Sequence, residues 1–90
     1  MSVKFTMPVF FQPVTNDRES IEVEGKTVRE CLEAIIREYP AIRKLLMDKK
    51  GKLHNYVGVY INGKDAYPNE MDKEVKPGDE VHVLYTLAGG

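Results

Sequence analysis

Hydrophobic and polar residues alternate along four stretches of the chain. This period of two is typical of a β-strand that buries one face. The apolar positions are Val3, Phe5 and Met7; Ile21 and Val23; Val57, Val59 and Ile61; and Val81, Val83, Tyr85 and Leu87. We therefore expect strands over residues 3–7, 20–24, 56–61 and 81–87.

Between the second and third stretches the spacing of apolar residues changes to three and four, which is the period of a helix with one buried face. The residues on that face are Val28, Cys31, Leu32, Ile35, Ile36 and Tyr39. Thr27 and Glu30 match a capping box at the start of this helix, and Pro40 disfavours helical angles at its end. The pattern predicts a helix over residues 28–39 and a short second helical turn that begins at Pro40.

The segments between these elements carry turn signals. Asn-Gly at 62–63 and Pro-Gly at 77–78 predict tight turns, the second with glycine at positive φ. Residues 9–17 contain two aromatics, a proline and the turn formers Asn16 and Asp17, and we interpret them as a loop or an irregular extension of the first strand. The charged run 48–52 is interpreted as a solvated loop.

The order of two strands, one long helix and further strands predicts an α+β fold in which helices cover one face of a sheet. A chain of 90 residues forms one core. We expect a single domain over residues 1–90, with a flexible tail at 88–90. Its expected buried residues are Val28, Leu32, Ile35, Ile36, Val59, Ile61, Val81 and Val83.

Composition excludes several classes of partner. Thirteen Lys and Arg against 14 Asp and Glu give a net charge of -1, so no global positive field attracts nucleic acid or an anionic membrane. The apolar run 7–11 is too short for a secretion signal or a membrane span, which favours a cytoplasmic location. A single cysteine, Cys31, forms no internal disulfide and no Cys-x-x-Cys pair.

No arrangement of residues typical of a catalytic or metal site is apparent. His54 and His82 lie far apart without a third ligand at characteristic spacing, so we expect surface or hydrogen-bonding roles and no metal. Cys31 belongs to the apolar helix face, which favours a core role over that of a thiol that relays sulfur. We therefore expect a protein that is not an enzyme and binds no cofactor itself.

The pair Gly89-Gly90 follows the last predicted strand, with only Ala88 between them and Leu87. A frayed end or a cloning remnant is the simplest explanation. A glycine end also suits delivery of its carboxylate into a narrow site, because glycine lacks a Cβ. That carboxylate is ionised and inert at neutral pH, so it requires activation. An acyl-adenylate formed from ATP and Mg²⁺, then displaced by a sulfur donor, would leave a thiocarboxylate on Gly90.

These features resemble the ubiquitin-like sulfur carriers of the MoaD/ThiS family, whose hallmark is a β-grasp domain that ends in Gly-Gly. Residues 87–90 are similar to the small-residue endings of these carriers. Residues 52–54, 56–57 and 59–62 are similar to the carrier used in one branch of cysteine biosynthesis. The resemblance covers essentially the whole chain and implies a ubiquitin-like β-grasp fold, with a mixed sheet packed on one main helix.

The resemblance also implies partners. An E1-like adenylyltransferase would use ATP and Mg²⁺ to activate Gly90, with Ala88 and Gly89 as the rest of the tail. A sulfhydrylase or the large subunit of molybdopterin synthase would accept the sulfur, and a metal-dependent peptidase is a further candidate partner. Cysteine, molybdopterin and thiazole synthesis remain open as pathways. So do a protein modifier joined to lysines through Gly90 and a plain binding module on this fold.

Strand parity predicts a docking patch. If Val81, Val83 and Tyr85 face the helix, then His82 and Leu84 face away from it, as does Tyr60 on the preceding strand. An apolar leucine beside a tyrosine on an open sheet face indicates a contact surface. The resemblance implies that the activating enzyme meets this face and the tail together. Single exposed apolar residues without a role are the alternative.

Overall fold

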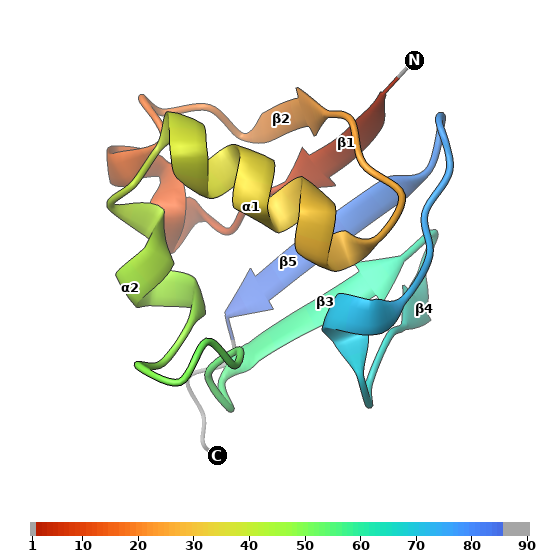
Figure 1. Ribbon diagram of the computed structural model, residues 1–90. Helices are drawn as coiled ribbons and strands as arrows, with labels where there is room; N and C mark the ends of the chain where they lie inside the picture. Colours follow the sequence, from red (N-terminus) through yellow and green to blue (C-terminus); the bar gives the residue numbers. More distant parts are fainter. Residues whose placement is uncertain (1, 86–90) are drawn as a thin grey trace.

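A five-stranded mixed sheet with one long helix across it forms the protein (Figure 1). The computed structural model describes residues 2–85, so the expected tail at 88–90 and positions 86–87 of the last predicted strand lie outside it. The strands are β1 (Val3–Thr6), β2 (Ser20–Val23), β3 (Val57–Ile61), β4 (Lys64–Asp65) and β5 (Glu80–Tyr85). The helices are η1 (Val9–Val14), α1 (Val28–Glu38), α2 (Ile42–Leu46) and η2 (Glu70–Asp72), where η marks a 3₁₀ helix.

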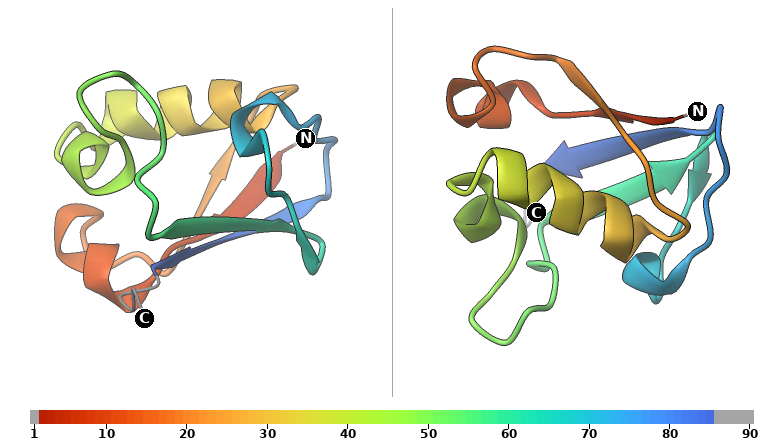
Figure 2. Two further views of the ribbon diagram at one scale, coloured as in Figure 1. Left: turned by 90° about the horizontal axis from the view of Figure 1, so that it is seen from below. Right: turned by 45° about the horizontal axis from the view of Figure 1, so that its top comes forward.

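The sheet has the strand order β2-β1-β5-β3-β4, which is the β-grasp arrangement that the resemblance implies. β1 and β5 are parallel, while β2 pairs antiparallel with β1 and β3 pairs antiparallel with β5. α1 lies on one side of the sheet and leaves the other face uncovered (Figure 2). Within residues 2–85, no helix combines the length and the apolar character that crossing a bilayer requires.

The start of α1 confirms the predicted capping box, with one difference. The Thr27 hydroxyl accepts a hydrogen bond from the Glu30 N–H at 3.2 Å, and the Glu30 carboxylate accepts from the Lys26 N–H at 2.9 Å, one residue before the cap. The helix ends at Glu38, and Tyr39 leaves helical angles at φ -129° ψ 76°. This departure agrees with the following Pro40, which disfavours helical angles at the residue before it.

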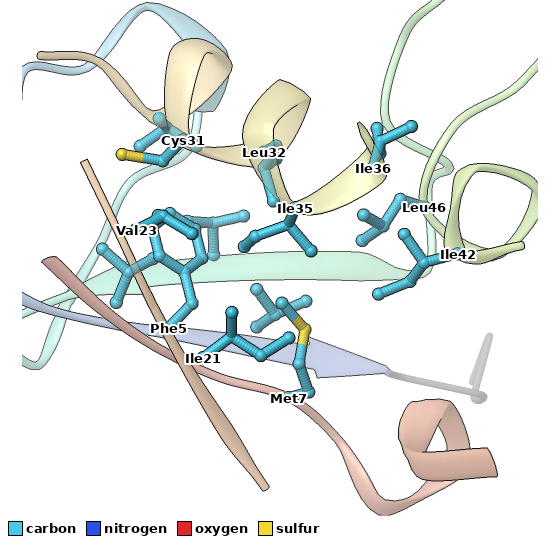
Figure 3. Close-up of a cluster of buried hydrophobic side chains, with 14 of the residues drawn as sticks. Phe5, Met7, Ile21, Val23, Cys31, Leu32, Ile35, Ile36, Ile42 and Leu46 are labelled. Carbon is cyan, nitrogen blue, oxygen red and sulfur yellow. The ribbon is translucent and has the colours of Figure 1, made fainter. Parts of the chain in front are cut away.

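The core lies between α1 and the sheet, where Leu32 and Ile35 point toward Phe5 and Ile21 (Figure 3). Seven of the eight residues predicted to be buried are buried. The prediction for Ile61 is wrong, since its side chain is only half-buried. Ile61 is the last residue of β3, next to the turn at 62–63, and its partner in β4 is Lys64, so the sheet covers it less completely.

The interpretation of residues 9–17 as a loop or irregular strand is wrong for its first part, which forms η1. Within it Phe11 is fully buried, and the Phe11 N–H donates to the Pro8 carbonyl at 2.9 Å. The first-strand pattern ends at Met7, whose N–H donates to the Glu19 carbonyl at 2.8 Å and so joins β2. Burial of one aromatic residue therefore fixes a segment that has no periodic pattern of its own.

Both predicted turns are confirmed, whereas β4 and η2 were not predicted. Asn62 and Gly63 have φ values of 51° and 86° and connect β3 to β4, and Gly78 has φ 92°. β4 has two residues and η2 has three, too few for a periodic pattern to appear. These short elements depend on pairing with β3 and on packing against α1.

Gly25 lies against the first turn of α1, and its replacement tests how tightly the helix packs. A Cβ at this position would lie 2.8 Å from the Cys31 Sγ and 3.0 Å from the Cys31 backbone nitrogen. The Sγ can turn only about one bond within the core, and the backbone nitrogen cannot move without α1, so Gly25→Ala forces a small shift between the helix and residue 25. We expect it to lower the free energy of unfolding by about 1–3 kcal/mol in urea denaturation.

Gly58→Ala is the matched control, since the same methyl group meets only ordinary contacts at 3.9 Å from the Leu84 Cβ and the Tyr60 Cε1. We expect it to change stability by less than about 0.5 kcal/mol. Equal losses in the two variants would show that Gly25 is not a packing constraint.

Candidate functional site

The strand directions determine what surrounds the base of the tail. β5 ends at Tyr85, the last described residue. Because β1 runs parallel to β5, η1 follows β1 at the same end of the sheet. Because β3 is antiparallel to β5, the start of β3 also lies there, with Val57 opposite Tyr85. Two segments distant in sequence therefore flank the residue from which the tail continues.

Aromatic rings from these segments pack around Tyr85. The Phe10 ring stacks on the Tyr85 ring with centroids 4.7 Å apart, and the Phe11 and Tyr56 rings meet it edge-on at 5.9 and 4.8 Å. The His54 ring stacks on Tyr56 at 4.7 Å. We call these five residues the tail collar. Each such ring pair contributes about 0.5–1.5 kcal/mol beyond burial, so the collar holds the end of β5 in place.

Tyr60, His82 and Leu84, the residues predicted to form a docking patch, lie together on the sheet. Tyr60 is paired with His82 and Leu84 with Gly58. The Tyr60 Cε1 and the Leu84 Cβ flank the position above Gly58, as the 3.9 Å distances show. Leu84 is 43% exposed, whereas Tyr60 and His82 are half-buried. The geometry agrees with the predicted parity, and the docking role stays a prediction.

An open groove of about 900 Å³ extends along β3 beside this patch. Tyr60 and Leu84 contribute apolar surface to it. Charged side chains of both signs line it, and these are Arg29, Lys50, Lys52, Asp65, Glu70 and Asp72, with Arg29 paired to Asp72 at 3.1 Å. The patch therefore continues into a surface with charges of both signs.

Cys31 lies in the core, as predicted. Its side chain is fully buried on α1, and burial, with a smaller effect of the neighbouring Glu30 carboxylate, raises the pKa of the thiol. The thiolate is the nucleophilic form, so both access and ionisation oppose a sulfur-relay role.

We expect Cys31 to react slowly with Ellman's reagent at pH 8 in the native protein and rapidly in denaturant. The raised pKa means that at this pH the folded protein holds less thiolate than the unfolded chain. Absorbance at equal protein concentration measures both rates. Fast stoichiometric labelling of the native protein would contradict the assigned core role.

The two histidines occupy different surroundings. The His54 Nε2 lies 3.0 Å from the Lys44 carbonyl oxygen, and the His82 Nε2 lies 4.0 Å from a Glu80 carboxylate oxygen. Within residues 2–85 no three His, Cys, Asp or Glu side chains converge as metal ligands would. The histidines thus take the hydrogen-bonding and surface roles expected of them.

Comparison with known proteins identifies the family. The family model described as the ThiS family matches residues 9–90. The chain belongs to the ThiS family. Among its relatives is the sulfur carrier protein CysO of Mycobacterium tuberculosis, 30% identical over a 93-residue alignment that covers 100% of both chains. The small archaeal modifier protein 1 of Haloferax volcanii is 27% identical over 71 residues, 78% of each chain.

A solved structure agrees with this ThiS-family assignment. The structure of the Amycolatopsis orientalis BexX/CysO complex matches with a TM-score of 0.87 and 30% identity, covering 98% of this chain and 99% of the matched one. The ubiquitin-like β-grasp fold is therefore shown, as is the resemblance to sulfur carriers.

Sequence reasoning missed the tail collar. Its strongest signal was the adjacent pair Phe10-Phe11, which breaks the alternation of the first strand. The other predicted tail residues, Ala88, Gly89 and Gly90, lie outside the described residues.

Proposed function

We propose that this ThiS-family protein is a sulfur carrier whose Gly90 carboxylate becomes a thiocarboxylate for the synthesis of cysteine or a related sulfur compound. The observation that carries the proposal is the end-to-end match to a sulfur carrier protein, CysO. The Gly89-Gly90 sequence after the last strand supplies the group that such chemistry needs.

The reaction begins with a carboxylate that is too stable to accept sulfur. An E1-like adenylyltransferase transfers AMP from ATP to a Gly90 oxygen, releasing pyrophosphate and making the carbonyl electrophilic. Sulfide then attacks that carbonyl and displaces AMP, which leaves the Gly90 thiocarboxylate. Mg²⁺ and cationic groups of the enzyme stabilise the charge on the phosphates. The carrier supplies the acyl group and no catalytic side chain.

The tail collar supports this role by fixing where the tail begins. Phe10 and Tyr56 hold Tyr85 from two sides. Five residues remain beyond Tyr85, and an extended segment of that length reaches about 17 Å. A rigid base and a reach of this size allow the carboxylate to enter an active site while the folded domain stays on the enzyme surface.

A second function, attachment to lysines of other proteins through Gly90, is favoured by the likeness to the Haloferax volcanii modifier protein. Both functions require the same adenylate, and they differ in the nucleophile that attacks it.

Exchange of radiolabelled pyrophosphate into ATP tests the first chemical step. With the E1-like enzyme of the same organism and Mg²⁺, exchange should depend on this protein and saturate with its concentration. Exchange that is equal without the protein would refute adenylation of Gly90.

A further inference from the structure

Charge is unevenly distributed along the chain. Five of the 13 Lys and Arg but one of the 14 Asp and Glu lie between residues 43 and 52, a charge of +4, which leaves -5 for the remainder. We call residues 43–52 the basic segment. Its cations are Arg43, Lys44, Lys49, Lys50 and Lys52, all exposed. A net charge of -1 thus conceals a concentrated positive region.

Residues 48–52 of the basic segment form an exposed loop, as interpreted from the sequence, and hydrogen bonds to Asp48 give this loop a defined conformation. One Asp48 carboxylate oxygen accepts from the Lys50 and Lys52 N–H groups at 2.8 and 3.0 Å, and the Asp48 N–H donates to the Lys52 carbonyl at 2.8 Å. The hydrogen bonds from the Lys52 and Lys50 N–H groups lower the pKa of the Asp48 carboxyl, and they direct its charge to the backbone of the loop. None of the five cations forms an ion pair with another residue of the described part of the chain.

The basic segment is joined to both parts of the candidate site. Its Lys44 carbonyl contacts His54, which stacks on Tyr56 of the tail collar. On its other side, Lys50 and Lys52 line the same groove as Tyr60 and Leu84. An enzyme that covered the docking patch and received the tail would therefore also cover these cations.

We propose that the adenylating enzyme presents an acidic surface to the basic segment and that this charge pairing steers the carrier onto it. The inference rests on the proposed function, since it takes the same enzyme as partner. Complementary charge at an interface raises the association rate and fixes orientation more than it raises affinity. Steering of this kind increases association rates by roughly 10–10³-fold.

A nucleic acid would also be attracted by lysines. However, the rest of the protein carries a net charge of -5, which repels a long polyanion that extends beyond the basic segment. A partner with one local acidic surface avoids this repulsion. The distribution of charge favours the enzyme.

The test compares two double charge reversals in the full chain. Lys50→Glu/Lys52→Glu changes the basic segment and keeps the backbone N–H groups that Asp48 accepts from. Lys26→Glu/Lys76→Glu is the control, with an identical change in net charge. Lys26 and Lys76 flank Val75, whose N–H donates to the Lys26 carbonyl, near the start of β1 and away from the tail collar. Circular dichroism melting shows whether each variant folds. If Lys50→Glu/Lys52→Glu does not fold, Lys50→Gln/Lys52→Gln is used in its place.

Stopped-flow association with the purified adenylating enzyme should be at least tenfold slower for Lys50→Glu/Lys52→Glu at low salt and less than about threefold slower for the control. The wild-type rate should fall as ionic strength rises, and the reversal should flatten this dependence. Equal rates in the two variants would overturn the inference. The inference would also be overturned if the wild-type protein bound a single-stranded RNA oligonucleotide at about 0.15 M salt and the Lys50→Glu/Lys52→Glu variant did not.

Association needs no turnover, so the result is independent of the pyrophosphate exchange that tests the proposed function. If association depends on the basic segment but no pyrophosphate exchange occurs, adenylation of Gly90 is refuted and the acidic contact is not. If pyrophosphate exchange occurs but the association rate does not depend on the basic segment, the acidic contact is refuted and adenylation is not.

Discussion

Deletion of Gly90 should abolish thiocarboxylate formation and leave the free energy of unfolding unchanged within about 0.5 kcal/mol. The chemistry is lost because the shortened chain places its carboxylate one residue, about 3.3–3.6 Å, short of the activated position. Stability is retained because the core is built from residues 3–83. Mass spectrometry after incubation with the adenylating enzyme, ATP, Mg²⁺ and sulfide measures the first effect, and urea denaturation measures the second.

Two substitutions in the tail distinguish length from shape. Gly89→Val should impair activation, since a β-branched side chain restricts the backbone and meets the walls of a narrow channel. Ala88→Ser keeps a small side chain and should retain activity. A truncated protein that still accepted sulfur would contradict the assignment of Gly90.

Leu84→Asp should weaken association with the adenylating enzyme at least tenfold, which corresponds to about 1.4 kcal/mol, without unfolding the protein. Leu84 is 43% exposed on the face away from α1, so an aspartate there is solvated in the free protein. In the complex the charge would be buried without a partner, which is costly. Isothermal titration calorimetry against the enzyme gives the affinity.

Two neighbouring changes serve as controls for that experiment. Leu84→Met keeps an apolar side chain of similar volume and should bind within about threefold of the wild type. Val83→Asp, one residue away, should unfold the protein because Val83 is 1% exposed. Unfolding of Leu84→Asp, or unchanged binding by it, would show that Leu84 is not part of the docking patch.

Local patterns in the sequence predicted most of the fold. The apolar face of α1 and its cap at Thr27 depend on residues within four positions of each other, and both are confirmed. Alternation predicted β1, β2, β3 and β5 to within one or two residues over the described part of the chain. Ile61 was misjudged because its burial depends on how far the sheet extends past the turn at 62–63, which alternation does not report.

The candidate site divides in the same way. Strand parity correctly placed Tyr60, His82 and Leu84 on one face. The tail collar brings together Phe10 and Tyr85, residues 75 positions apart, and it exists only because β1 and β5 are parallel. The charged run at 48–52 is exposed, as interpreted, but nothing local indicates that Lys50 and Lys52 line the same groove as Leu84. Contacts between distant segments are what the sequence pattern could not supply.

The location of transferred sulfur tests the central claim most directly. The wild-type protein is incubated with the E1-like enzyme, ATP, Mg²⁺ and sulfide, and its intact mass and fragments are recorded under non-reducing conditions. We predict that one oxygen is replaced by sulfur and that the change maps to Gly90, with Cys31 unmodified. Sulfur that mapped to a residue other than Gly90, or no gain of sulfur while the enzyme is active, would contradict the carrier mechanism.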